Sequence, residues 1–264
     1  MDKLLTEKET TELSKYRFNA ELDRFFEASN VLDEAFLKKF MANLSSRIGA
    51  PSEKVAASIF IKRYAFLAVI ALYAMTAWSK KINVSLDGVT MESASGEGNW
   101  LPSFSFKDIT VQEWNGAVAR SEWRKRVIRD LFAKNIYPII AFFEKTFGIS
   151  RFILWENIAV YVFWVYESEL TEHENALEDF TFLIFEANGS LFGRYKQNPL
   201  QKYYAEKSYL EEWSEEVRIR KTCCFTYQLE GSSKRCKTCP CNLNAKNGRC
   251  QDGEGFCSAI RGLA

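Results

Sequence analysis

Cysteine is the residue type whose placement in this chain most clearly indicates chemistry. All seven cysteines lie between positions 223 and 257, and none occurs in the first 222 residues. Cysteines that served only as small apolar side chains would be spread through the core segments. Their confinement to one segment predicts a role that needs thiolates, and the residues are Cys223, Cys224, Cys236, Cys239, Cys241, Cys250 and Cys257.

Three kinds of thiol site are compatible with this clustering. A disulfide scaffold is typical of small secreted domains, and it is disfavoured by the odd number of cysteines and by a charged N-terminus without an apolar leader. Structural zinc is favoured by Cys236 and Cys239, whose CxxC spacing is that of a zinc knuckle. An iron–sulfur cluster is also held by thiolates, usually four of them.

The adjacent pair Cys223 and Cys224 helps to distinguish the last two sites. Zinc knuckles usually separate their ligands by two to four residues. Adjacent residues of an extended chain point to opposite faces, so this pair reaches one ion, or two neighbouring irons, only where the backbone turns locally. The pair therefore favours an iron–sulfur cluster, while zinc stays open.

The cysteine segment also resembles a known family. Residues 220–227 (RKTCCFTY) and 236–240 (CKTCP) are similar to the C-terminal signature of FhuF-like ferric-siderophore reductases, including Tyr227 and Pro240. Weaker similarity is found in Lys62-Arg63-Tyr64 and in residues 154–157 (LWEN). The resemblance covers roughly residues 50 to 240.

The resemblance implies a [2Fe–2S] cluster bound by Cys223, Cys224, Cys236 and Cys239. The sequence departs from the family pattern in two respects. Residues 225–235 make a loop of eleven residues instead of ten, which is a small change because loop closure depends weakly on length. The additional thiols are reserve ligand candidates, and they are Cys241, Cys250 and Cys257.

The activity implied by the resemblance is one-electron reduction of Fe(III) in a siderophore, expected to be a hydroxamate, with release of Fe(II). The sequence has no Walker loop, and its GxG pairs at 96–98 and 253–255 lack the rest of a dinucleotide fingerprint. We therefore expect an external electron donor, such as a ferredoxin or a flavoprotein. The alternatives are a zinc-ribbon-type binding module and an iron–sulfur redox or sensor protein without reductase activity.

Charge and the N-terminus restrict the partners further. The net charge of +1 argues against a nucleic-acid-binding protein. From residue 218 onward, nine cationic residues face three acidic ones, so this segment carries about +6 and would attract an acidic donor. The charged N-terminus favours a cytoplasmic location, with peripheral association to the inner face of the cell membrane as a further expectation.

The rest of the sequence predicts an α+β fold, predominantly helical, with a small antiparallel sheet. We expect a mostly helical body over residues 1–217 and a cysteine-rich segment over 218–264, which could be one integrated domain. The apolar run 64–79 is shorter than a typical membrane span and is interpreted as a buried helix that Ser52 caps.

Several local predictions accompany this fold. Residues 1–50 have helical spacing, 82–86 and 89–91 are expected to form a hairpin around Asp87-Gly88, and 210–216 a helix. Residues 218–227 alternate as in a strand that delivers the cysteine pair. Lys62 and Arg63 are interpreted as a solvated stripe, and Asn157 as a buried residue that braces the fold.

Overall fold

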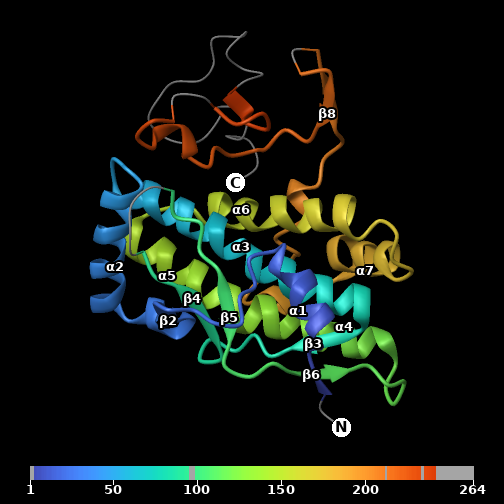
Figure 1. The fold of residues 1–264 in the computed structure, drawn as a ribbon. Helices are drawn as coiled ribbons and strands as arrows, with labels where there is room; N and C mark the ends of the chain where they lie inside the picture. The colour runs from blue at the N-terminus through green and yellow to red at the C-terminus, as the bar shows by residue number, and fades with distance from the viewer. Residues whose placement is uncertain (1–2, 95–98, 212, 233–234, 242–264) are drawn as a thin grey trace.

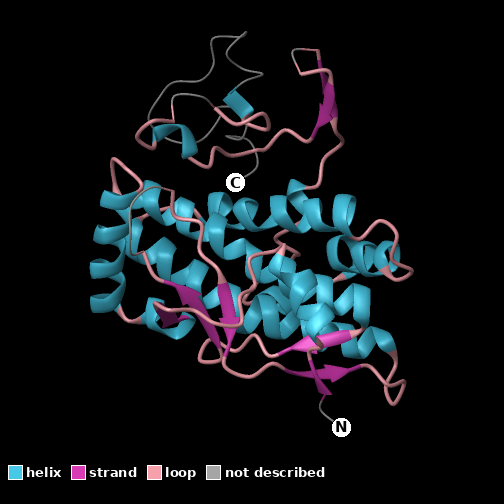
Figure 2. Cartoon of the chain, viewed as in Figure 1, coloured by secondary structure: helices cyan, strands magenta, loops and turns pink. Residues whose placement is uncertain are grey.

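The computed structural model describes residues 3–94, 99–211, 213–232 and 235–241. It confirms the predicted α+β class, with a helical body, small antiparallel sheets and cysteines near the C-terminal end (Figures 1 and 2). The α-helices are α1 (Glu7–Ser14), α2 (Glu34–Arg47), α3 (Glu53–Trp78), α4 (Arg120–Leu131), α5 (Tyr137–Phe147), α6 (Arg151–Trp164) and α7 (Ala176–Thr181).

Shorter helical turns extend or connect these helices. The π-helical turns η2 (Phe132–Ile136), η3 (Val165–Glu169) and η4 (Phe182–Glu186) continue α4, α6 and α7. The 3₁₀ turns are η1 (Ala28–Leu32), η5 (Gly189–Phe192), η6 (Gln201–Tyr203) and η7 (Thr226–Gln228).

The strands form small antiparallel sheets. One sheet has the order β1-β6-β3, a second has the order β2-β4-β5, and β7 pairs with β8. The strands are β1 (Lys3–Leu4), β2 (Phe25–Glu27), β3 (Lys80–Ile82), β4 (Val89–Glu92), β5 (Phe104–Phe106), β6 (Thr110–Glu113), β7 (Ser208–Leu210) and β8 (Glu215–Val217). The two three-stranded sheets lie against the helices on the side of the molecule opposite the cysteine segment, whereas β8 lies on the same side as that segment (Figure 1).

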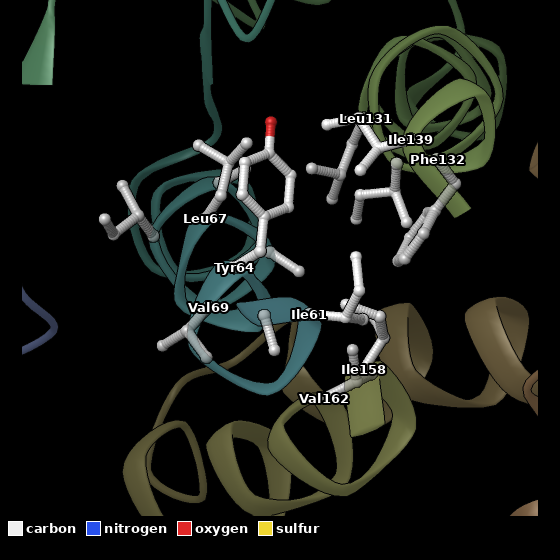
Figure 3. Close-up of a cluster of buried hydrophobic side chains, with 14 of the residues drawn as sticks. Ile61, Tyr64, Leu67, Val69, Leu131, Phe132, Ile139, Ile158 and Val162 are labelled. Carbon is white, nitrogen blue, oxygen red and sulfur yellow. The ribbon is translucent and has the colours of Figure 1, made fainter. Parts of the chain in front are cut away.

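Helix α3 is the central element of the core. Ser52 caps its N-terminus by accepting a hydrogen bond from the backbone N–H of Val55 at 3.4 Å. Its apolar side chains pack against α4, α5 and α6, and Figure 3 shows Ile61 and Tyr64 of α3 in one cluster with Ile158 of α6. By length and composition α3 could cross a membrane, but 89% of its most apolar window is buried inside the protein. This burial confirms the prediction of a core helix.

Only one stripe of α3 reaches the surface between Val55 and Thr76. Every residue in this interval is buried except Lys62, Arg63 and Phe66, which are half-buried. Positions i, i+1 and i+4 of a helix share one face, so the three side chains form a continuous patch. Lys62, the first residue of the stripe, contacts the cysteine segment.

Helix α6 packs along α3, and the segment after β8 lies across both helices (Figure 1). Three tail residues, Cys223, Phe225 and Cys239, belong to the same buried apolar cluster as the helices of the body. The cysteine segment is therefore packed against the core of the body, and the covalent link after β8 is not its sole connection to the body.

Some local predictions are wrong. The expected hairpin around Asp87-Gly88 does not form, because β3 pairs with β6 whereas β4 pairs with β2 and β5. Residues 1–50 contain β1 and β2 besides helices, and the helix expected over 210–216 is replaced by the β7–β8 hairpin. Residues 218–227 belong to none of the described sheets and end in η7.

Candidate metal centre

The backbone turns immediately after the cysteine pair. Phe225 has a left-handed conformation with φ of 61°, an uncommon and strained state for a bulky residue. Ser58 of α3 fixes the turn by donating a hydrogen bond from Oγ to the carbonyl oxygen of Cys224 at 2.9 Å. The CxxC segment turns too, since the Cys239 N–H donates to the Cys236 carbonyl at 2.9 Å. These turns meet the condition under which adjacent thiols can serve one centre.

The turns bring the four predicted ligands into one series of sulfur contacts. Side-chain hydrogen bonds join Cys224 to Cys236, Cys236 to Cys239, and Cys239 to Cys223. Cys223, Cys224 and Cys239 are buried, while Cys236 is half-buried. Four thiols from two segments twelve or more residues apart thus share one partly enclosed site.

Hydrogen bonding and burial move the pKa values of these thiols in different directions. The hydrogen bond between Cys239 and Cys223 lowers the pKa of Cys223 and raises the pKa of Cys239. The hydrogen bond with Cys236, together with burial, raises the pKa of Cys224 to about 11. Cys224 and Cys239 therefore keep their protons at neutral pH, and binding of a metal would have to displace them.

Polar groups of the body and the tail surround the sulfurs. The Phe225 N–H donates to Cys223 Sγ at 3.4 Å, and the Lys62 ammonium donates to Cys224 Sγ at 3.8 Å. Lys62 also donates to Thr226 Oγ1 at 3.2 Å, and Thr226 Oγ1 lies 3.0 Å from Cys224 Sγ. Lys62 is therefore a neighbour of the thiols, and the interpretation of this residue as part of a solvated stripe is wrong.

Glu156 of α6 holds the backbone that precedes the cysteine pair. Its carboxylate is 2% exposed and accepts hydrogen bonds from the N–H groups of Lys221 at 2.6 Å and Thr222 at 2.7 Å. The Thr222 hydroxyl donates to the same carboxylate. Two consecutive backbone donors therefore converge on one buried charge, which fixes the position of the chain next to Cys223.

Asn157 connects the two cysteine segments to α3. Its amide nitrogen donates to the carbonyl and hydroxyl oxygens of Ser58, each at 3.0 Å, and its amide oxygen accepts from Arg220 at 2.6 Å. The backbone N–H of Arg220 donates in turn to the carbonyl of Thr238, inside the CxxC segment, at 2.8 Å. Asn157 braces the fold, as expected, and what it braces is the cysteine site.

A comparison with known families bears on this arrangement. Residues 58–212, more than half of the chain, match the family described as ferric iron reductase FhuF-like transporter. The chain belongs to the FhuF-like ferric iron reductase family. Among curated proteins, none matches the chain significantly.

The family match begins at Ser58 and ends before the first cysteine. It contains Lys62, Glu156 and Asn157, the body residues that hold or contact the cysteine segment in this FhuF-like protein. The ligand assignment of the thiols therefore depends on the chain's own residues, not on the matched region.

The chemistry of the donor set fits an iron–sulfur cluster. Four thiols share one site, backbone N–H groups and a cation face the sulfurs, and apolar side chains enclose it. Among the described residues, no three His, Cys, Asp or Glu side chains are arranged around a single metal ion. The sulfur contacts instead form a series, with Cys223 and Cys224 at its ends.

The additional cysteines differ in how they relate to this FhuF-like site. Cys241 is half-buried, and its backbone N–H donates to the sulfur of Cys239. It thus stays a reserve ligand beside the predicted four. Cys250 and Cys257 lie outside the described residues.

Sequence reasoning did not select Glu156 as part of the site. The sequence did contain a signal. Glu156 is the one charged residue in the segment 152–164, which is otherwise apolar apart from its neighbour Asn157. A charged residue within a buried helix must find a partner, and here the partner is the backbone of the cysteine segment.

Proposed function

We propose that this FhuF-like ferric iron reductase acts on Fe(III) held in a siderophore and uses a [2Fe–2S] cluster bound by Cys223, Cys224, Cys236 and Cys239. The observation that carries the proposal is the series of sulfur contacts that joins all four thiols. Zinc knuckles space their ligands by two to four residues, and the adjacent pair departs from that rule. When bound, the cluster would supply a one-electron carrier.

The chemistry of the substrate explains why one electron is sufficient. Fe(III) is a hard cation that anionic oxygen donors of a hydroxamate bind tightly, and Fe(II) is held far less well. The ferric ion takes up one electron and becomes Fe(II), and the chelate then releases it as its oxygens take protons from water. No covalent intermediate is formed, so the protein needs only to place the chelate close to the thiol site.

The residues around the thiols support such a centre electrostatically. Four thiolates carry a large negative charge, which the Lys62 ammonium and the N–H groups of Phe225 and Cys241 offset. The turn at Phe225 and the Glu156 carboxylate hold the sulfurs in place. The protein therefore supplies position and charge, while the electron comes from an external donor such as a ferredoxin or a flavoprotein.

The decisive experiment is anaerobic purification followed by a visible spectrum with iron and acid-labile sulfide counts. We expect two irons and two sulfides per chain, with a spectrum that changes strongly in each of the four Cys→Ser variants. Cys241→Ser is the matched control and should keep the spectrum. Zinc without acid-labile sulfide would overturn the cluster assignment. Loss of the visible spectrum in Cys241→Ser would overturn the choice of the four ligands.

Activity is tested on the chemically reduced protein. Ferric hydroxamate chelates should reoxidise it faster than buffer alone, and a ferrous trap should collect the released iron. If no chelate reacts, siderophore reduction is not the activity, even where the cluster is present.

A further inference from the structure

The surface beside the thiol site combines two cations with three aromatic rings. On α3, Arg63 and Phe66 belong to the half-buried stripe, and on α6, Tyr161 and Trp164 are half-buried at equivalent i, i+3 spacing. Arg17, which follows α1, places its guanidinium 4.7 Å from the centre of the Phe66 ring. We call this set, Arg17, Arg63, Phe66, Tyr161 and Trp164, the α3–α6 face.

The rings of this face are in mutual contact. Phe66 lies 4.9 Å from Tyr161 and 6.4 Å from Trp164 between ring centroids. Both pairs are tilted, with interplanar angles of 52° and 58°, and together the three rings make a continuous apolar surface. The Arg17 guanidinium lies over the Phe66 ring, so a positive charge is in direct contact with this apolar surface.

The two arginines have unusual surroundings. The Nε atoms of Arg17 and Arg63 are buried and have no hydrogen-bond partner, and neither arginine forms an ion pair with a carboxylate in the described part of the chain. Arg17 donates one hydrogen bond, to the Leu101 carbonyl at 3.1 Å. Burial and the neighbouring charge of Arg63 lower the pKa of Arg17, while Tyr161 and Glu92 act in the opposite direction. Two like charges close together without a direct ion pair destabilise a fold, and an anionic ligand would relieve this repulsion.

The position of the face relates it to the thiols. Lys62, the first residue of the stripe, contacts Cys224 Sγ, and Arg63 follows it directly. Phe66 lies four residues after Lys62, which corresponds to a rise of about 6 Å along the helix axis. A molecule bound on the face would therefore lie next to the thiol site.

We propose that the α3–α6 face binds the ferric chelate, with Arg17 and Arg63 pairing with negative charge on it and the three rings contacting its apolar part. This inference rests on the proposed function and adds a substrate class, namely anionic ferric chelates in preference to neutral or cationic ones. Compact chelates suit the face better than a protein surface, because the buried Nε atoms leave only the guanidinium ends to reach a ligand.

A matched series of chelates tests the preference. A linear trihydroxamate with a terminal amine gives a ferric chelate of +1, and acetylation or succinylation of that amine gives 0 or −1 with the same iron coordination. The chemically reduced protein is mixed with each chelate at low salt, in a single turnover without a donor protein. We expect the −1 chelate to reoxidise it at least about tenfold faster at subsaturating concentration than the +1 chelate, with the ratio falling as salt is added.

Variants locate the preference. Arg63→Gln and Arg17→Gln should weaken the apparent affinity for the −1 chelate several-fold, improve it for the +1 chelate, and leave the limiting rate nearly unchanged. Arg63→Lys, which keeps the charge, should retain most of the preference. Arg126→Gln on α4 removes one exposed positive charge elsewhere and should change nothing. The visible spectrum and Tm identify any variant that fails to fold or to bind its cluster.

Binding is measured separately from electron transfer. Gallium(III) chelates of the same series cannot be reduced, and calorimetric titration should show the same order of affinity and the same loss in Arg63→Gln. If all chelates react but charge and the two substitutions have no effect, the inference is wrong while the proposed function stands. If none reacts, the proposed function fails, and gallium chelate binding still decides whether the face recognises anionic chelates.

Discussion

Single residues of α6 determine how the cysteine segment is held. The Glu156 carboxylate receives the N–H groups of two consecutive tail residues, and it lies 3.6 Å from the Arg220 guanidinium. Such a buried carboxylate is stable only while these donors are present, because an unpaired buried charge costs several kcal/mol. The two parts therefore stabilise each other: Glu156 of α6 fixes the tail backbone, and the tail N–H groups stabilise the buried charge of Glu156.

Glu156→Gln tests this mutual dependence. The substitution keeps the size but points an NH₂ group at N–H donors, so the iron-loaded protein should lose about 3 kcal/mol of unfolding free energy in urea under anaerobic conditions. The iron-loaded variant should also lose its visible absorbance faster in the presence of a chelator. Glu178→Gln, a largely exposed carboxylate that pairs with Arg124, is the control and should stay near wild type. Equal effects in the two variants would contradict the role of Glu156.

Lys62 gives a second prediction at this scale. A cation beside Cys224 stabilises the reduced, more negative state of a centre bound there, so Lys62→Gln should lower its reduction potential. One charge at this distance in a wet environment corresponds to about 1 kcal/mol, or ~40 mV for one electron. Redox titration followed at the visible band measures it. Lys38→Gln, in an exposed pair with Glu34 on α2, is the control, and an unchanged potential in Lys62→Gln would exclude the electrostatic role.

At the scale of elements, helices were more predictable than strand partners. The apolar run 64–79 is long and charge-free, and most of it lies buried in α3 as expected. The hairpin prediction failed because period-two alternation identifies a strand without its partner, and β4 pairs with β2, which is distant in sequence. The expected strand over 218–227 donates to Glu156 in place of a neighbouring strand.

The candidate site was predictable to a similar degree. Residue type indicated a thiolate site, because few side chains bind metals as thiolates do, and the family resemblance selected four of the seven cysteines, a ligand set that stays a prediction. The roles of Lys62 and Glu156 could not be derived, since each depends on which segment folds onto the helix. Asn157 was expected to brace the fold, but the sequence did not show that its partners are Ser58 and Arg220.

The start of the cysteine segment is attached to η3 by a pH-dependent contact. Arg218 donates two hydrogen bonds to Glu167, at 2.7 and 3.1 Å, and Lys207 lies 3.2 Å from the same carboxylate. Burial acts to raise the pKa of Glu167, but the bonds from Arg218 and the charge of Lys207 outweigh it, and the pKa is lowered. A lowered carboxyl pKa stabilises the fold above the unfolded value of 4.5, and the stabilisation is lost as pH falls through the folded value.

Glu167→Gln should therefore cost about 1 kcal/mol of unfolding free energy at neutral pH. The difference from wild type should shrink as the pH is lowered below 4.5, because wild type then loses the same charge. Urea unfolding at several pH values measures it. Glu34→Gln, which removes an exposed pair with Lys38, should show no measurable change at neutral pH. A difference that stays constant with pH would show that Glu167 acts through packing alone.

At the scale of the whole molecule, one site is assembled from distant parts of the chain. Ser58 and Lys62 come from α3, Glu156 and Asn157 from α6, and the thiols from two segments of the tail. Several cations of the tail already have partners on the protein: Arg218 with Glu167, Arg220 with Asn157 and Lys237 with Glu215. The attraction of an acidic donor, expected from the tail's net charge, stays a prediction.

Removal of iron tests the division into a body over 1–217 and a cysteine segment over 218–264. Chelation under reducing conditions should leave the helix signal in circular dichroism nearly unchanged, because α3 and α6 are held by apolar packing. The tail should become sensitive to trypsin at residues such as Lys221 and Lys237, and Tm should fall. Helix loss in parallel with tail cleavage would show instead that body and tail form one cooperative unit.

The order of the elements along the chain also has a consequence for biosynthesis. A ribosome delivers α3 and α6 before residues 220–239, so Ser58, Glu156 and Asn157 are present on the nascent chain before the segment that pairs with them. During this interval the Glu156 carboxylate and the Asn157 amide are hydrated, and the surface that the cysteine segment later covers is exposed to water. Chains produced with too little iron would accumulate in this open state, and we expect degradation in the cell to act on it first.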